Sequence, residues 1–101
     1  MDSFFNKMIS ENDFVLIDFY AVWCEPCKWA LPVLDKVSKH FGDRIHFEKI
    51  DIDQHIEISR SFHILSVPTF VLFHKSHEVW RMRGFDAPEK MIKQIGEYLE
   101  R

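Results

Sequence analysis

The stretch VLIDFYAVWCEPCK, residues 15–28, joins a run of β-branched and aromatic residues to both cysteines of a 101-residue chain. Such a run is typical of a strand buried on both faces of a parallel sheet, and a single acid, Asp18, interrupts it. Cys24 and Cys27 are three positions apart within WCEPCK, residues 23–28. They could form a reversible redox couple, half of a metal site or a structural disulfide, and each of these would imply a different function.

The segment after the first cysteine has the pattern of a helix packed on one side, because apolar residues recur at three- and four-residue intervals up to Phe41. We expect Cys24 at the N-terminus of this helix, where free N–H groups favour a thiolate and lower the thiol pKa below its free value. Pro26 is compatible with an early helical position. Cys27, one turn later, would be the shielded partner of an exposed Cys24 and close enough to bond with it.

The other periodic segments alternate between strand-like and helix-like patterns. They predict helices over residues 3–10, 24–41, 56–62 and 87–101, and strands over residues 14–21, 44–53, 69–74 and 78–83. Strands alternating with helices imply an α/β fold with helices on both faces of the sheet. In such sheets the active site lies where a strand ends and the next helix begins, which is the position of WCEPCK.

Composition limits the size and the partners of the protein. With 47% hydrophobic and 15% aromatic residues in 101, we expect one core and a single domain over residues 1–101. The net charge of -3 gives no basic face for nucleic acid or an anionic membrane. No window approaches the roughly 20 apolar residues of a membrane span. The N-terminal residues lack the pattern of a secretory signal, so we expect a cytoplasmic protein, in which C-x-x-C is more often catalytic or metal-binding than a structural disulfide.

Four segments together resemble the thioredoxin family. VLIDFYAVWCEPCK is similar to its active-site strand and helix, usually written W-C-G-P-C-K, and EKIDID, VPTFVLF and RGF resemble later motifs in the same order. The chain departs from the family pattern twice. No counterpart of the N-terminal edge strand precedes SFFNKM, which implies a thioredoxin fold with a shortened mixed sheet of about four strands, and Glu25 replaces the glycine between the cysteines.

The resemblance implies a mechanism. Cys24 would attack a substrate disulfide, and Cys27 would then attack Cys24 to release the reduced substrate. Asp18 and Lys49 match the family's buried acid and its neighbouring lysine, and the carboxylate would accept the proton of Cys27 through water. The proline matching Pro68 is cis in the family. The apolar surface that contacts the substrate is implied to consist of Trp23, Pro26, Val67, Pro68, Gly84 and Phe85, with the Val67 backbone pairing with an extended substrate segment.

Electrostatics adds two expectations. Burial should raise the pKa of Asp18, while Lys49, if it is close, should pull that pKa down. The carboxylate of Glu25 should oppose formation of the Cys24 thiolate slightly, and Lys28 should cancel part of this effect.

We therefore expect a thiol–disulfide oxidoreductase that acts as a monomeric reductase of disulfide-containing proteins. It would receive electrons from a separate reductase, and no bound cofactor is implied. The alternative is a thioredoxin-fold peptide-binding or chaperone-like module without redox turnover. A zinc site would need about four ligands, and we expect no metal because no histidine has a paired spacing beside the cysteines. The histidines that would have to converge are two of His40, His46, His55, His63, His74 and His77.

Overall fold

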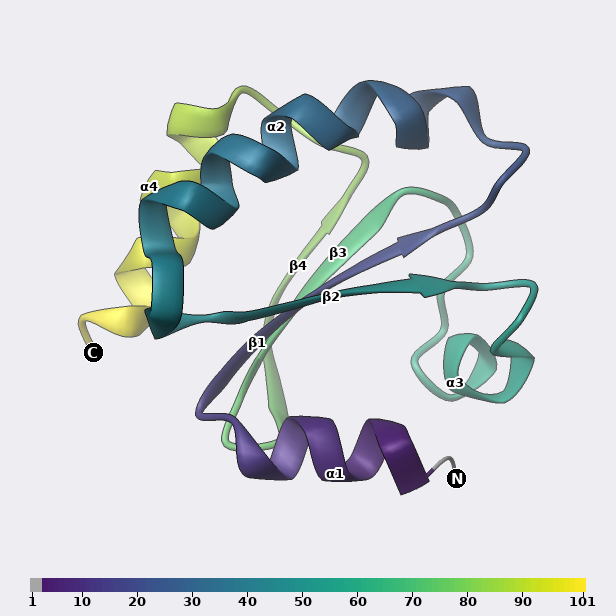
Figure 1. The fold of residues 1–101 in the computed structure, drawn as a ribbon, viewed down its shortest axis with the longest axis horizontal. Coiled ribbons are helices and arrows are strands. Elements are labelled where there is room, and N and C mark those ends of the chain that lie inside the picture. Colours follow the sequence, from purple (N-terminus) through teal and green to yellow (C-terminus); the bar gives the residue numbers. More distant parts are fainter. Residues whose placement is uncertain (1–2) are drawn as a thin grey trace.

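A computed structural model describes residues 3–101 and confirms the predicted order of helices and strands (Figure 1). The helices are α1 (Ser3–Glu11), α2 (Glu25–Phe41), α3 (Ile56–Ser61) and α4 (Pro88–Leu99), with a short 3-10 helix η1 (Gly42–Arg44). The strands are β1 (Phe14–Tyr20), β2 (His46–Asp51), β3 (Thr69–His74) and β4 (His77–Arg83). Strand β2 begins at His46, whereas the sequence predicted a start at residue 44, because Arg44 belongs to η1.

No helix among residues 3–101 is long and apolar enough to cross a bilayer.

The sheet is mixed, with four strands in the order β2-β1-β3-β4. Strands β1 and β2 are parallel, whereas β3 is antiparallel to both of its neighbours, β1 and β4. The residues before β1 form helix α1, so within residues 3–101 no strand pairs with the outer side of β2. The predicted four-stranded sheet without an N-terminal edge strand is confirmed.

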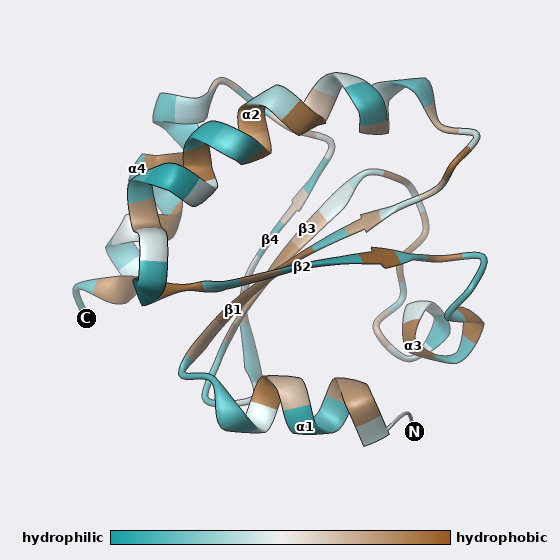
Figure 2. Cartoon of the chain, viewed as in Figure 1, coloured by the Kyte–Doolittle hydropathy of each residue, from teal (hydrophilic) through white to brown (hydrophobic). Residues whose placement is uncertain are grey.

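Helices cover both faces of the sheet, α1 and α3 on one and α2 and α4 on the other (Figure 1). Side chains alternate between the two faces along β1, so Ile17 packs in the cluster that contains Phe5 of α1, and Leu16 packs in the cluster that contains Val37 of α2. Figure 2 shows hydrophobic residues along β1 and β3, with hydrophilic residues prominent on α2 and α4. Both faces of β1 are therefore buried, as its continuous apolar sequence predicts.

The β3–β4 hairpin forms without glycine in its turn. Lys75 and Ser76 both have positive φ, 49° and 72°, which two-residue turns usually assign to Asn or Gly. The turn is tied to the α1–β1 connection, because the Lys75 N–H donates to the Asp13 carbonyl at 2.8 Å and Ser76 Oγ donates to the Ile9 carbonyl at 3.2 Å. These bonds compensate for a backbone conformation that the sequence itself does not favour.

Strand pairing brings three loops together at one end of the sheet. Strand β1 ends at Tyr20 and leads to α2, while the antiparallel register places Phe19 of β1 opposite Thr69 of β3. The loop before β3 therefore lies beside the start of α2. Thr69 is in turn opposite Arg83 of β4, so the chain after β4 reaches the same end.

Candidate active site

Cys24 and Cys27 form a disulfide at the start of α2, with their Cα atoms 5.3 Å apart. Cys24 is the N-cap residue of the helix, and its Sγ accepts a hydrogen bond from the Cys27 N–H at 3.2 Å. Pro26 lies in the first helical turn, where a missing N–H costs nothing. The predicted position of Cys24 at the helix N-terminus is confirmed. A helix start is a position that favours a thiolate over a thiol.

The expected exposure of Cys24 is wrong. Its exposed fraction is 4%, against 5% for Cys27, so both cysteine residues are buried in the disulfide-bonded structure. The loop before β3 provides part of the cover, because the Val67 carbonyl oxygen lies 3.6 Å from Cys24 Sγ. The residues that pack against the two cysteines are Tyr20, Ala21, Ile52 and Val67.

The loop before β3 holds the predicted proline beside the disulfide. The Val67–Pro68 peptide bond is cis, as the resemblance implies. The Gly84 N–H donates to the Pro68 carbonyl at 2.7 Å, which fixes the chain after β4 against this loop. Gly84 has a φ of +83°, a conformation that favours glycine. The structure thus places Val67 next to Cys24 and joins the loop that holds Val67 and Pro68 to Gly84.

Two residues on the loops at this end of the sheet have exposed aromatic side chains. Trp23 is 67% exposed and Phe85 is 36% exposed. The Trp23 indole N–H donates to a carboxylate oxygen of Asp53 at 2.9 Å, and this partner was not predicted from the sequence. It could have been found, because Trp23 follows β1 and Asp53 follows β2, and the carboxyl ends of parallel strands meet at one edge of a sheet.

Asp18 is buried under the site, with 1% of its surface exposed. Its Oδ1 has no hydrogen-bond partner among the described residues. Burial raises the pKa of Asp18 to about 6, and the charge of Lys49 offsets part of that rise. Both predicted directions are confirmed, and a carboxyl with this pKa can exchange a proton near neutral pH.

Lys49 lies on β2 directly opposite Asp18 of β1. Its side chain is exposed, and its ammonium lies 4.4 Å from the centre of the Tyr20 ring. A cation over an aromatic face is attracted by the ring quadrupole, which holds the ammonium near the edge of the sheet. The ammonium of Lys49 therefore contacts the Tyr20 ring, and it lowers the pKa of Asp18 through the charge alone.

The charge of Glu25 is partly compensated. Lys28 Nζ lies 3.1 Å from Glu25 Oε1 in an exposed i,i+3 pair. This contact gives a structural basis for the expectation that the charge of Lys28 offsets part of the charge of Glu25.

Among the described residues, no group of three or more His, Cys, Asp or Glu side chains is arranged to hold a metal ion.

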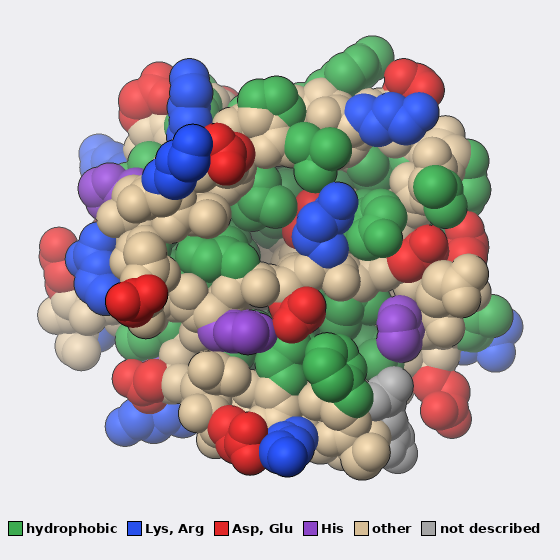
Figure 3. Space-filling model, in the orientation of Figure 1, with side chains coloured by type: hydrophobic (Ala, Val, Ile, Leu, Met, Phe, Trp, Pro, Cys, Tyr) green, Lys and Arg blue, Asp and Glu red, His purple; other side chains and the backbone are tan. Residues whose placement is uncertain are grey.

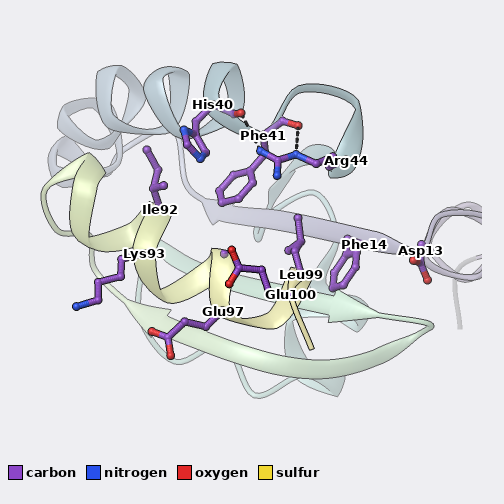
Figure 4. A pocket seen from close by; sticks show the side chains of 11 residues that line it. Asp13, Phe14, His40, Phe41, Arg44, Ile92, Lys93, Glu97, Leu99 and Glu100 are labelled. Carbon is purple, nitrogen blue, oxygen red and sulfur yellow. Dashed lines mark hydrogen bonds between the residues drawn. The ribbon is translucent and has the colours of Figure 1, made fainter.

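A larger cavity lies at the far end of α2. It has a volume of about 650 Å³ and opens between the end of α2, the end of α4 and the start of β1 (Figure 4). Phe14 and Phe41 lie on its wall, and the Arg44 guanidinium donates to the carbonyls of His40 and Phe41 at 3.1 and 3.2 Å. None of the predicted site residues lines this cavity. The Cys24–Cys27 disulfide therefore lies away from this cavity, at the opposite end of α2.

A mixed sheet in which a buried strand leads into a helix capped by a C-x-x-C disulfide, beside a cis-proline loop, defines a thioredoxin-fold dithiol–disulfide protein. A family model described as Thioredoxin matches residues 1–97. The chain belongs to the thioredoxin family, whose chemistry is thiol–disulfide exchange.

Individual relatives agree with this membership. The chain is 35% identical to a chloroplastic thioredoxin Y of Oryza sativa subsp. japonica, over 97% of its own length and 59% of the plant protein. It is 34% identical to a bifunctional thioredoxin reductase/thioredoxin of Mycobacterium leprae (strain TN), covering 94% of this chain and 21% of that protein. The oxidised form of mitochondrial thioredoxin 3 from Saccharomyces cerevisiae superposes with a TM-score of 0.85 at 34% identity, covering 94% of this chain and 88% of that one. This chain thus spans less than two thirds of the plant and mycobacterial relatives.

Proposed function

We propose that this chain is a protein disulfide reductase that works through a reversible Cys24–Cys27 dithiol–disulfide couple. The observation that carries the proposal is the disulfide at the N-cap of α2, with the Val67 carbonyl oxygen 3.6 Å from Cys24 Sγ. A sulfur at a helix start is favoured as a thiolate, which is the attacking species in disulfide exchange. A loop backbone beside that sulfur can align an extended substrate segment.

The reaction begins with the dithiol. The Cys24 thiolate attacks one sulfur of a substrate disulfide, a mixed disulfide forms, and the other substrate sulfur leaves as a thiolate. Cys27 then loses its proton and attacks Cys24 Sγ, which releases the second substrate sulfur and forms the Cys24–Cys27 disulfide. Two electrons pass to the substrate, and the disulfide-bonded structure described above is the oxidised product state.

Asp18 is the proposed acceptor of the Cys27 proton, acting through water. Its burial and its pKa of about 6 suit a group that takes up a proton and gives it back near neutral pH. Lys49 is proposed to tune this acid by its charge from the neighbouring strand. Glu25 and Lys28, which are exposed, are proposed to adjust the reduction potential of the Cys24–Cys27 couple through their charges.

The substrate is proposed to bind over the disulfide against an apolar rim. The rim would consist of Trp23, Pro26, Val67, Pro68, Gly84 and Phe85. The exposed fractions of Trp23 and Phe85 support this role, because exposed aromatic side chains are enriched in protein contact surfaces. The hydrogen bond from Trp23 to Asp53 would hold the indole in place before the substrate arrives.

We also propose the setting in which the protein works. It would act as a monomeric single domain in a reducing compartment, the cytoplasm, without nucleic-acid or membrane partners. The oxidised couple would be reduced by a separate reductase. The mycobacterial relative, whose name joins a thioredoxin reductase to a thioredoxin, supports a partner of this kind.

Turnover of a disulfide-bonded protein, with a low-molecular-weight dithiol as electron donor, tests the proposal. Wild type should catalyse the reduction, whereas Cys24→Ser should be inactive. Cys27→Ser should accumulate mixed disulfides through Cys24, which mass spectrometry of the trapped complexes would detect. Mixed disulfides that form with Cys24→Ser, while Cys27→Ser stays inert, would reverse the two roles. A wild type that binds peptides without turnover would favour the peptide-binding module.

A further inference from the structure

The outer edge of β2 is open for strand pairing. Strand β2 pairs with β1 through six consecutive positions, from Val15↔His46 to Tyr20↔Asp51, without a register shift. In the part of the chain from residue 3 onward, nothing pairs with its other side. A regular edge strand presents a row of backbone donors and acceptors that another chain can use.

The direction of these backbone groups follows from one hydrogen bond. The Ile52 N–H, just past β2, donates to the Tyr20 carbonyl at 2.9 Å and so points toward β1. Backbone groups alternate in direction along a strand that pairs on one side, so the N–H groups of Phe47, Lys49 and Asp51 point away from β1. Those of Glu48 and Ile50 point toward it.

The opposite edge of the sheet is less suited to pairing. Strand β4 has a register shift against β3 between Leu72 and Phe73, and irregularities of this kind interrupt pairing. Trp80 Nε1 donates to Gln94 of α4 at 3.0 Å, and the Arg81 guanidinium donates to the Phe62 carbonyl at 2.7 Å. The β2 edge has no such shift.

The surface beside the β2 edge contains a hollow and apolar side chains. Figure 3 shows hydrophobic side chains on both sides of the middle of this face, where β2 crosses it. A hollow of about 270 Å³ lies between α2 and β2, with Leu31, Leu34 and Phe47 in its wall. Leu31 is 41% exposed and Phe47 is half-buried. This volume is below the range typical of small-molecule pockets and suits one or two side chains.

We propose that the β2 edge binds an extended segment of a partner protein as an additional antiparallel strand. Main-chain hydrogen bonds to the outward groups of Phe47 and Lys49 would give affinity, and the side chains would give specificity. An apolar residue of the segment would lie opposite Phe47 and enter the hollow. An acidic residue would lie opposite Lys49 and a basic one opposite Glu48, because opposite charges across a strand pair are favourable.

A second copy of this chain fits the edge less well. Residues directly opposite in an antiparallel pair share a face, and Glu48 and Lys49 are on different faces, so a two-fold dimer cannot pair Glu48 with Lys49 of the other copy. Registers centred on Glu48 or on Lys49 place like charges opposite each other. The register centred on Phe47 leaves Lys49 opposite Ile45. The register centred on Ile50 pairs Lys49 with Asp51 of the other copy, but it places Asp53 opposite Phe47 and Ile52 opposite Glu48. No two-fold register within residues 45–53, which follow η1, therefore gives Phe47 an apolar partner, Lys49 an acidic partner and Glu48 a basic partner together.

Binding at the β2 edge does not involve the disulfide, because the bound segment needs no cysteine. A probe peptide with the sequence Thr-Val-Glu-Lys-Leu-Thr-Val, blocked at both ends, places Glu, Lys and Leu opposite Lys49, Glu48 and Phe47. A control peptide with Glu and Lys exchanged has the same composition. NMR titration of wild type should give at least about fivefold weaker binding for the control, as expected for two reversed charge pairs.

Hydrogen exchange gives the sharper readout of the same titration. The probe should slow exchange of the amide protons of Phe47, Lys49 and Asp51, and leave those of Glu48 and Ile50 unchanged. Protection elsewhere, no binding at millimolar peptide, or equal binding of both peptides would overturn the proposal. A dimer of wild type alone, seen by sedimentation and with the same outward amides protected, would assign the edge to a second copy and overturn it too.

Two variants separate the backbone and charge contributions. Phe47→Pro removes an outward N–H that β1 does not use, so the fold should survive and peptide binding should be lost. Glu48→Lys should abolish the preference between the two peptides, because each then makes one favourable and one unfavourable charge pair. This second variant keeps the test decisive if Phe47→Pro fails to fold. A preference that persists in Glu48→Lys would contradict the proposed register.

Discussion

Asp18 is the residue at which stability and chemistry conflict most clearly. A buried carboxyl with an unpartnered oxygen is costly to ionise, and its pKa rises from the usual 3.8 to about 6 because of this burial. The native state therefore binds the proton more tightly than the unfolded state does. The resulting contribution to stability is fully present below pH 3.8 and is lost as the pH rises through about 6.

Asp18→Asn should stabilise the oxidised protein at pH 8 but not at pH 3.5. The rise in the Asp18 pKa corresponds to about 3 kcal/mol of native-state cost when the carboxyl is ionised, so we expect a gain of about 1 to 3 kcal/mol from the neutral amide. The same variant should slow the release of substrate by Cys27. Denaturant unfolding at both pH values measures the gain. A loss of stability at neutral pH would mean that Asp18 acts as a paired structural charge.

Glu25→Gln should shift the reduction potential slightly in the oxidising direction. Removing the carboxylate stabilises the thiolate of the reduced form, and Lys28, now unpaired, adds to the effect. Both side chains are exposed, so we expect a shift of at most ~20 mV, larger at low salt than at high salt. Lys28→Gln is the matched control and should shift the potential the opposite way. A shift in the same direction for both variants would contradict the electrostatic explanation.

The start of α2 illustrates what a sequence can predict about one element. Apolar periodicity after Cys24 and the adjacent Pro26 were sufficient to place the first cysteine at the helix N-terminus. The cover over that cysteine comes from Val67, which is distant in sequence and reaches it only through strand pairing. The exposure of Cys24 therefore depends on tertiary contacts that no local pattern encodes.

Replacing Gly84 and Gly96 with alanine should change the stability of the protein in opposite directions. Gly84 after β4 has a φ of +83°, so Gly84→Ala should destabilise the protein by about 1 to 2 kcal/mol despite the open space around it. Gly96 lies inside α4 with only Phe41 nearby at 3.9 Å, so Gly96→Ala should stabilise by about 0.5 to 1 kcal/mol. Thermal unfolding measures both changes. Stabilisation by Gly84→Ala would show that the positive φ is not required.

At the scale of the whole molecule, the alternation of strand and helix patterns was sufficient to predict the layers, and the resemblance to the thioredoxin family implied the shortened sheet of about four strands. Buried strands such as β1 give continuous apolar runs, and helices give three- and four-residue intervals. Contacts between separate elements could not be read from these patterns. The bond from Trp23 to Asp53 and the position of Lys49 over Tyr20 both depend on how β1 and β2 end side by side. Parallel pairing of β1 and β2 is enough to predict that Trp23 and Asp53 lie near each other, but the side-chain contacts themselves are seen only in the three-dimensional structure.

The most direct test of the central claim is the reduction potential of the Cys24–Cys27 couple. Equilibration with a dithiol redox buffer, followed by tryptophan fluorescence or by thiol trapping, would measure it. A reductase should have a value of about −270 mV, because its disulfide must be harder to reduce than those of its substrates. A value of about −120 mV would mean that the couple donates its disulfide to other proteins, and it would contradict the proposed direction of electron flow.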